Sequence, residues 1–273
     1  MTSVSDVVIV GGGVQGLMIA YDLSVHGHKV TVLEAAGAVG GLAGAVQIPE
    51  SGPALIDRFY HCILSSDRFM NALCQELDLQ DKLHFTPTQM AFFGKDGGLH
   101  QMSTPKQFLT FPLISPLARV RLGASIVWSN LRQRPGALES ISMEKWLRRT
   151  AGSEVYETLW GPLLQSKFDD DFGHLPASYM WARLKRMMST RDSKGVEEMG
   201  HLEGGYQTLI DHLATKVRAA GGQILTGVRV EALERDAETG RVRYVETTDT
   251  EGQARRFEGD AVVLTVPLSV PAW

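Results

Sequence analysis

The hydrophobic pattern at the start of the chain predicts a strand, a helix and a second strand. Residues 7–10 form an uninterrupted apolar run, as in a parallel strand that is buried on both faces. A glycine turn separates this run from residues 14–26, which have the composition of a helix. Residues 30–34 form a second apolar run that ends on an acid. The order predicts a βαβ unit.

The pattern becomes helical in the middle of the chain, where four of the five tryptophans also lie. Prolines at 105, 112 and 116 precede a predicted helix over residues 117–131. We therefore predict three parts: the first part of an α/β domain over residues 1–55, a mostly helical insertion over residues 56–199, and the second part of the α/β domain over residues 200–273.

The last part returns to alternating helix and strand. Residues 206–220 place Leu209, Ile210, Leu213 and Val217 on one helical face, and a glycine pair follows as a C-cap. Strands are predicted over residues 223–226 and 228–233, and a polar β-excursion over 241–257. Residues 260–267 are predicted to form a closing apolar strand that ends in a loop.

The glycine turn of the βαβ unit has the spacing G-x-G-x-x-G. Gly11 permits the tight turn, Gly13 leaves room for a pyrophosphate, and Gly16 lets the helix pack close to the strand. The same spacing also occurs in glycine-rich turns that bind nothing. Here the strand, helix, second strand and acid all follow in register, which favours dinucleotide binding.

The first turn of the predicted helix and the acid that ends the second strand supply the polar contacts of this predicted site. The first helical residues, Val14 and Gln15, carry unpaired amide groups that attract an anion. Glu34, followed by Ala35, ends the second strand where a ribose diol would lie. A carboxylate there repels the 2′-phosphate of NADP.

A second glycine pair follows a few residues after the acid. Gly40, Gly41 and Leu42 indicate that the backbone passes close to the ligand again, although a plain turn would have the same sequence. A dehydrogenase that uses NAD normally enters its next helix near this point.

Composition limits the possible partners. The chain has 273 residues, 44% hydrophobic residues and a net charge of −4, which disfavours a nucleic-acid partner. Cys62 and Cys74 form neither a disulfide framework nor a metal site, so we expect no metal and a reducing, cytoplasmic setting. The N-terminus has the pattern of neither a signal peptide nor a membrane span.

These motifs together resemble the superfamily of flavin-containing amine oxidases, phytoene desaturases and protoporphyrinogen oxidases. The resemblance rests on the two glycine segments, on residues 203–205 with the helix after them, and on residues 222–233 and 260–267. It implies an α/β fold in which a Rossmann-like, GR2-type FAD-binding domain is interrupted by a substrate-domain insertion. It also implies FAD as the cofactor, with the backbone of Val228 against the adenine.

The chain departs from that family in three places. Leu42 and Ala43 stand where amine oxidases commonly carry an arginine, and Asp57 is followed by Arg58 and Phe59 in place of a glycine pair. Family members are also longer, so we expect this chain to correspond to their N-terminal portion, with the C-terminal part of the fold missing.

Catalytic residues are harder to assign, because a flavin itself carries out the redox chemistry. The candidates are His61, which the resemblance places near the flavin, and Arg58 and Lys167, which could meet an anionic group of a substrate. Structural roles in packing and ion pairs are the alternative for all three. The acidic run 169–171 is expected to be a solvated loop.

An apolar stretch in the middle of the chain leaves peripheral membrane contact open. Its members could touch a membrane or admit an apolar substrate, and core packing explains them equally well. They are Phe108, Phe111, Leu113, Ile114 and Leu117.

Three functions remain open. The first is an FAD-dependent oxidoreductase that removes a hydride from a C–N or C–C bond of an apolar or polycyclic small molecule. The second is a non-redox flavoenzyme similar to UDP-galactopyranose mutase. The third is a non-catalytic protein on the same fold, comparable to the Rab GDP-dissociation inhibitors.

Overall fold

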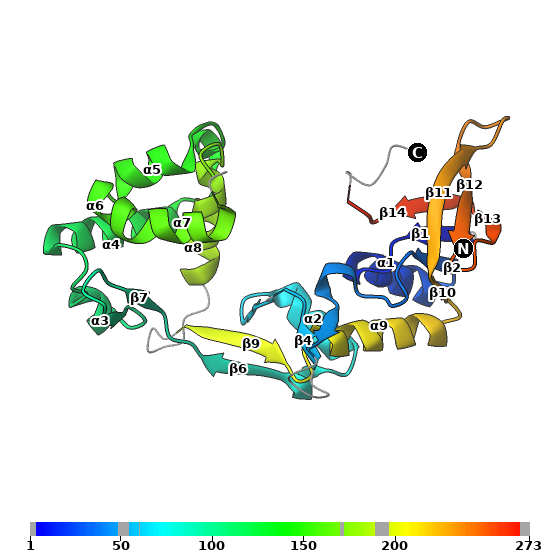
Figure 1. Cartoon of the computed structure of the whole chain (residues 1–273), viewed down its shortest axis with the longest axis horizontal. Coiled ribbons are helices and arrows are strands. Elements are labelled where there is room, and N and C mark those ends of the chain that lie inside the picture. Colours follow the sequence, from blue (N-terminus) through cyan, green and yellow to red (C-terminus); the bar gives the residue numbers. More distant parts are fainter. Residues whose placement is uncertain (1–3, 49–54, 60, 170–171, 189–196, 268–273) are drawn as a thin grey trace. The chain divides into compact units, whose positions relative to one another are not determined.

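The computed structural model describes residues 4–48, 55–59, 61–169, 172–188 and 197–267 (Figure 1). The chain divides into two compact units. Unit 1 comprises Met1–Cys62, Phe69–His84 and His201–Trp273, and unit 2 comprises Ile63–Arg68 and Phe85–Gly200.

Unit 1 is built on a parallel sheet of four strands in the order β10-β2-β1-β14. These strands are β1 (Asp6–Val10), β2 (Lys29–Glu34), β10 (Gln223–Thr226) and β14 (Ala261–Leu264). The apolar runs therefore form strands as predicted. The last strand ends at Leu264, and Thr265 begins the loop that the sequence predicts after it.

The two faces of β1 are buried against different partners, which explains why its sequence does not alternate. Val7 and Ile9 share a core cluster with residues of the helices α1 (Val14–Val25) and α9 (Tyr206–Ala219). Val8 and Val10 share another cluster with the polar excursion. A strand that is covered on both faces needs an apolar residue at every position.

The predicted excursion over residues 241–257 forms two strands of an antiparallel sheet of three. This sheet consists of β11 (Val228–Arg235), β12 (Val242–Asp249) and β13 (Ala254–Glu258), in that order. Its inward side chains Val228, Val230 and Val245 are buried, while Arg229 and Glu246 next to them are exposed. The predicted polar β-excursion is thus one covering layer of the parallel sheet.

Short elements complete unit 1, and they lie beyond the predicted domain boundary at residue 55. Leu77 and Leu79, which follow helix α2 (Arg68–Glu76), are fully buried. The Nζ of Lys216 on α9 lies 3.2 Å from Oδ2 of Asp78, so this stretch is attached to α9. Residues 56–62 and 69–84 consequently belong to unit 1, whereas the sequence predicts them in the insertion. The elements are η1 (Gly41–Ala43), β3 (Ala45–Gln47), β4 (Leu55–Asp57), α2 (Arg68–Glu76) and η3 (Gln80–Lys82).

Unit 2 is mostly helical, with β6 and β9 carrying the chain from one unit to the other. Its helices are α3 (Pro105–Leu109), α4 (Pro116–Leu131), η4 (Gly136–Ser140), α5 (Met143–Thr150), α6 (Ser153–Val155), the π-turn η5 (Tyr156–Trp160), α7 (Gly161–Phe168) and α8 (Ala177–Met188). The strands are β5 (Ile63–Leu64), β6 (Leu83–Pro87), β7 (Ala91–Phe93), β8 (Leu99–Gln101) and β9 (Glu198–Leu202).

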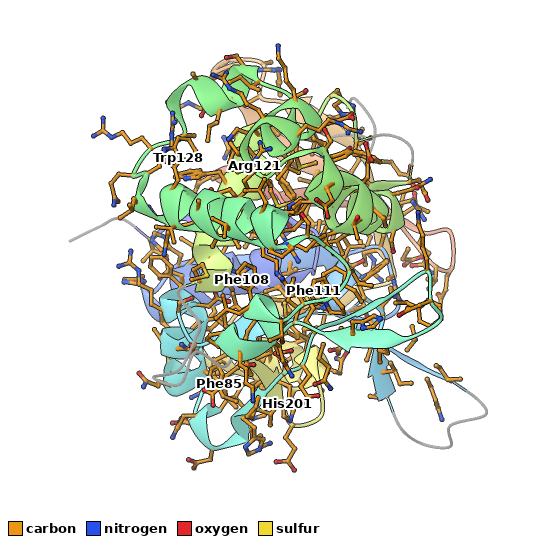
Figure 2. All side chains as sticks on the ribbon, turned by 90° about the vertical axis from the view of Figure 1, so that its left-hand side faces the viewer. Phe85, Phe108, Phe111, Arg121, Trp128 and His201 are labelled. Atoms are coloured by element: carbon orange, nitrogen blue, oxygen red, sulfur yellow. The ribbon has the colours of Figure 1, made fainter. Side chains whose placement is uncertain are left out.

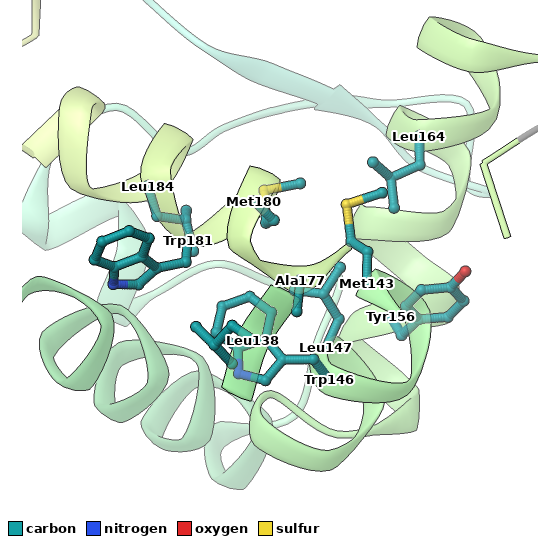
Figure 3. Packing of buried hydrophobic residues seen from close by; sticks show 10 residues of the cluster. All are labelled: Leu138, Met143, Trp146, Leu147, Tyr156, Leu164, Ala177, Met180, Trp181 and Leu184. Carbon is teal, nitrogen blue, oxygen red and sulfur yellow. The ribbon is translucent and has the colours of Figure 1, made fainter. Parts of the chain in front are cut away.

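Large apolar side chains from α5 and α8 form the main core of unit 2 (Figure 3). Met143, Trp146 and Leu147 extend from α5 and meet Met180 and Trp181 of α8. A second cluster contains Phe111 and Ile114, with Phe108 and Leu113 packed against it. Core packing therefore accounts for most of the apolar stretch that could have touched a membrane; Leu117 alone of its five members is exposed.

No helix among the described residues is both long and apolar enough to cross a membrane. Both cysteines are free. Burial raises the pKa of the Cys74 thiol, which agrees with an inert role, whereas Cys62 is half-buried.

We predict that Leu147→Ala destabilises unit 2 by about 2–4 kcal/mol, because the side chain is almost fully buried and its removal leaves a cavity. Urea unfolding followed by tryptophan fluorescence measures this change, since Trp146, Trp160 and Trp181 lie in the same core. Leu163→Ala, at a half-exposed position of α7, is the matched control and should cost much less. Equal losses for the two variants would contradict the assignment of the core.

Candidate cofactor-binding site

The glycine turn after β1 is held rigidly at the carboxyl edge of the parallel sheet. Gly11 adopts φ +107°, which favours glycine, and its N–H donates to the carbonyl of Leu33 at 2.8 Å. The hydroxyl of Thr265, just after β14, donates to the carbonyls of Val10 and Gly11 at 3.0 and 3.1 Å. Three neighbouring strands therefore fix this turn.

Gly16 allows the close contact between α1 and β1. A Cβ atom built on this residue would lie 2.0 Å from the carbonyl oxygen of Gly11, which no real contact tolerates. The helix must approach the turn this closely for its first amides to reach the edge of the sheet. The predicted packing role of Gly16 thus has a specific backbone partner.

The N-terminus of α1 is open. Gly13 is its N-cap, no side chain caps the helix within the described part of the chain, and its first turn contains no acid. The amides of Val14 and Gln15 begin the helix at this end. A Cβ on Gly13 would meet nothing within 4 Å. The open space beside Gly13 therefore lies at the end of α1 where the helix dipole favours an anion.

Glu34 is fixed at the end of β2 by two backbone amides. Its Oε2 accepts a hydrogen bond from Gly12 N at 2.7 Å, and its Oε1 accepts one from Ala36 N at 2.8 Å. Each carboxylate oxygen retains a further lone pair. The carboxylate is therefore oriented beside the glycine turn before any ligand arrives, and Ala35 next to it is exposed.

The second glycine pair lies directly against the first. Gly40 N donates to the carbonyl of Gly12 at 2.8 Å, and Gly40 forms a parallel bridge with Gly13. Gly40 and Gly41 have φ of +126° and +56°, and a Cβ on Gly41 would lie 3.3 Å from the Cα of Gly13. The structure thus brings the two segments together as one wall, with Leu42 exposed beside it.

Val228 is held near the two glycine segments through the residue before it, Gly227. Gly227 N donates to the carbonyl of Ala36 at 2.8 Å, which ties the corner between β10 and β11 to the residues after Glu34. The Val228 side chain is buried in the core, so only its backbone is placed to meet a ligand. Its contact with an adenine stays a prediction.

Asp57, which the sequence indicated only as a departure from the family, caps α9. Its Oδ1 accepts a hydrogen bond from Tyr206 N at 3.0 Å, and a Cβ on Gly205 would lie 2.6 Å from the same oxygen. Nearby, Arg58 N donates to the carbonyl of Gly44 at 3.1 Å, while the Arg58 side chain is exposed. In the sequence, the pair Gly204-Gly205 before α9 marks the place where this cap forms.

His61 also lies at the start of α9. Its ring centroid is 4.6 Å from that of Tyr206, and its Nδ1 is buried with no hydrogen-bond partner among the described residues. A buried ring nitrogen without a partner can accept or donate a bond to a bound molecule. Tyr60, which precedes it, lies outside the described residues.

The third catalytic candidate is in the other unit. Lys167 lies in the last turn of α7, where its Nζ is 5.8 Å from the centre of the Phe168 ring. Arg58 and His61 belong to unit 1, so the three candidates do not form one cluster within a unit. Asp169 has φ +50°, and Asp170 and Asp171 lie outside the described residues.

The donor set fits a dinucleotide. The open N-terminus of α1 suits a pyrophosphate, and the fixed Glu34 carboxylate suits a ribose diol. Because Gly13 has no Cβ, the space beside its backbone is free for the pyrophosphate. Within the described parts of the chain, no group of histidine, cysteine and acidic residues could hold a metal ion.

A family model described as flavin containing amine oxidoreductase matches residues 16–272. Since the match covers most of the chain, the protein belongs to this family. The predicted superfamily, the α/β fold class and FAD as the cofactor are thereby confirmed.

Two curated relatives share this region. The chain is 25% identical to the mitochondrial protoporphyrinogen oxidase of Nicotiana tabacum, over 98% of this chain and 59% of the relative. It is 23% identical to the 15-cis-phytoene desaturase of Capsicum annuum, over 97% of this chain and 47% of the relative. The chain thus spans about half to three fifths of the length of these relatives.

Solved structures show the same fold. An oxidoreductase from Methanosarcina mazei is similar with a TM-score of 0.70 and 18% identity, over 95% of this chain and 58% of the other. Reduced UDP-galactopyranose mutase has a TM-score of 0.65 at 18% identity, over 96% of this chain and 56% of the other. Rab GDI from Plasmodium falciparum has a TM-score of 0.60 at 15% identity, over 97% of this chain and 66% of the other. At such identities the shared feature is the fold.

We predict that Gly13→Ala raises the dissociation constant for FAD by about tenfold or more, because the added methyl group occupies the space for the pyrophosphate. The backbone at Gly13, with φ −71° and ψ 176°, suits alanine. The free energy of unfolding without cofactor should therefore change by less than about 1 kcal/mol. Fluorescence titration with FAD and urea unfolding measure the two quantities.

Gly173→Ala is the control, since its Cβ would also meet nothing within 4 Å and it lies in unit 2. It should leave both quantities unchanged. If Gly13→Ala binds FAD as tightly as the unmodified protein, the pyrophosphate does not lie over this residue.

Proposed function

We propose that this chain binds FAD with the pyrophosphate over Gly13 and the adenosine ribose on Glu34. The observation that carries the proposal is the open space at the uncapped N-terminus of α1, next to a carboxylate that two backbone amides already orient. Such preorganisation lowers the cost of ordering the site when the cofactor binds.

The second glycine pair and Val228 complete the proposed contacts. Gly40 and Gly41 line the pyrophosphate beside Gly13, and the positive φ of both residues favours glycine there. The backbone of Val228, tied to Ala36 through Gly227, supports the adenine. The proposed binding mode therefore uses backbone groups almost throughout, with Glu34 as the charged side chain.

The proposed activity is oxidation of an apolar or polycyclic small molecule at a C–N or C–C bond. Bound FAD supplies the acceptor for a hydride. Support comes from family membership and from relatives named for protoporphyrinogen and phytoene. In this chain, the buried and unpartnered Nδ1 of His61 is the group available to position substrate or cofactor by a hydrogen bond.

Two alternatives share this fold. A mutase-like flavoenzyme and a protein comparable to Rab GDI would each be compatible with the structural similarities. The second alternative gives no reason for an oriented Glu34 and an open glycine turn, which serve nucleotide binding. We therefore favour the function of an FAD-dependent oxidoreductase over the two alternatives.

We predict that the purified chain, reconstituted with FAD, shows the visible absorbance of oxidised flavin. Under anaerobic conditions, a substrate from a panel of amines and partially reduced polycyclic compounds should bleach that band, because the flavin is reduced when the substrate loses a hydride. Stopped-flow absorbance measures the bleaching. Gly13→Ala, which should bind little FAD, is the control for flavin bound at the proposed site.

Other outcomes contradict the proposal in different ways. Protein that cannot be reconstituted with FAD favours a non-catalytic role. Flavin that no substrate bleaches, together with turnover of a sugar nucleotide only after chemical reduction, favours the mutase-like alternative.

A further inference from the structure

One carbonyl group of the glycine turn depends on a side chain for its hydrogen bond. The carbonyls on either side of it, those of Val10, Gly12 and Gly13, all accept hydrogen bonds from backbone N–H groups. The Gly11 carbonyl accepts one from the hydroxyl of Thr265 at 3.1 Å, and no other described residue donates to it. A single hydroxyl from the far end of the chain therefore satisfies a backbone group that the turn leaves unpaired.

The geometry of the turn explains why a side chain supplies this bond. Gly11 has φ +107°, and α1 begins only at Val14, so the Gly11 carbonyl lies outside the hydrogen bonds of the helix. The helix also approaches closely. A Cβ on Gly16 would lie 2.0 Å from the Gly11 oxygen and 3.0 Å from the Thr265 hydroxyl oxygen. The hydroxyl therefore occupies part of the space that a side chain on Gly16 would need.

The Thr265 hydroxyl is not required to hold β14 in the sheet. Strand β14 pairs with β1 along its whole length. The N–H of Thr265 extends this pairing by donating to the Val10 carbonyl at 2.9 Å. The hydroxyl lies 3.0 Å from the same carbonyl, and it shares its one hydrogen between Val10 and Gly11. The bond to Gly11 is therefore what the hydroxyl adds to the contacts of the backbone.

The Gly11 carbonyl and the Gly12 N–H belong to one planar peptide group and point in opposite directions. At the N–H end of this group, Gly12 N donates to Oε2 of Glu34 at 2.7 Å. At the carbonyl end, the Thr265 hydroxyl donates. Two side chains, one a donor and the other an acceptor, thus hold the two ends of the same peptide group. We call this pair of side chains the peptide clamp.

A peptide group between two glycines rotates easily, because neither neighbour has a Cβ that restricts φ and ψ. Rotation of this group would turn the Gly11 oxygen toward the Glu34 carboxylate, where two negative oxygens repel each other. Glu34 would then keep only one of the two amides that orient it, that of Ala36. The orientation of the ribose acid therefore depends on the orientation of the peptide group.

We infer that Thr265 is a positioning residue of the cofactor site. Through the peptide clamp, its hydroxyl fixes the Gly11–Gly12 peptide group, which in turn holds Glu34 beside the ribose and the start of α1 beside the pyrophosphate. Thr265 acts through the peptide group and needs no contact with the cofactor. Because Glu34 and the start of α1 are the proposed contacts of FAD, the inference rests on the proposed function.

A purely structural role would have different consequences. A hydroxyl that only stabilised unit 1 would lower the free energy of unfolding when removed, and the folded protein would still bind FAD with its usual affinity. In the positioning role, removal of the hydroxyl weakens FAD binding by the folded protein. The dissociation constant of folded variants therefore separates the two roles.

We predict that Thr265→Val raises the dissociation constant for FAD by about five- to tenfold, since the peptide group loses one of its two side-chain bonds. Thr265→Ala, which also lacks the hydroxyl, should behave in the same way. Thr265→Ser keeps the hydroxyl and should bind FAD within about twofold of the unmodified chain. Titration followed by flavin fluorescence measures these constants.

Thr247→Val is the matched control. Thr247 also belongs to unit 1, and its hydroxyl donates to a backbone carbonyl, that of Arg255, at 3.1 Å. The substitution removes the same kind of bond on β12 and should leave the dissociation constant for FAD unchanged. The described tryptophans all lie in unit 2, where Figure 2 labels Trp128. Circular dichroism, rather than tryptophan fluorescence, therefore shows that these variants of unit 1 are folded.

A double-mutant cycle tests the coupling between Thr265 and Glu34. Glu34→Ala removes the acceptor at the N–H end of the peptide group, so the peptide clamp is already broken in this variant. Thr265→Val should then raise the dissociation constant by no more than about twofold further. Thr247→Val should have the same effect with and without Glu34→Ala.

Hydrogen exchange provides a readout without cofactor. Thr265→Val should increase the exchange rates of amides in residues 11–17 by about fivefold or more, because the turn is less firmly held, and should leave β12 and β13 unchanged. Thr247→Val should instead affect β12 and β13 and leave residues 11–17 as they are.

The possible failures are distinguishable. Equal FAD affinity in Thr265→Val and the unmodified chain, or independent effects of Thr265→Val and Glu34→Ala, would overturn the inference and leave the proposed FAD site standing. An unmodified chain that binds no FAD would contradict the proposed function. In that case unchanged exchange of residues 11–17 in Thr265→Val would also show that the peptide clamp does not exist.

Discussion

The contact between the start of α1 and the end of β1 is the constraint on which unit 1 depends. Because a Cβ on Gly16 would lie 2.0 Å from the Gly11 carbonyl, only glycine lets the helix begin so close to the sheet edge. This approach sets the position of the first amides of α1. It also leaves the Gly11 carbonyl where Thr265, from the far end of the chain, can donate to it.

Around this contact, polar backbone groups are paired while the ligand space stays open. Gly12 uses its N–H for Glu34 and its carbonyl for Gly40, so one residue links the acid and the second glycine segment. Gly13, next along the chain, has open space beside it. The same backbone therefore builds a rigid wall and presents it to a nucleotide, which is the basis of the proposed FAD site.

Unit 2 obeys a different constraint. Its helices bury large side chains such as Trp146 and Trp181, and this packing fixes the rotation of α4. Burial of Ala118, Leu122 and Ser129 determines by default which residues of α4 remain outside. Core packing in unit 2 thus decides which side of α4 is exposed.

The sequence by itself determined the βαβ unit, the glycine turn with Glu34 and the second glycine pair, because local spacing and glycine geometry specify them. Tertiary structure decided that Phe111 belongs to the core while Leu117 is exposed, since one-dimensional hydrophobicity does not distinguish a covered helix face from an open one. It also decided that Asp57 caps α9 and that the ring of His61 packs against that of Tyr206. These pairs are about 150 residues apart, and only the folded chain brings them into contact.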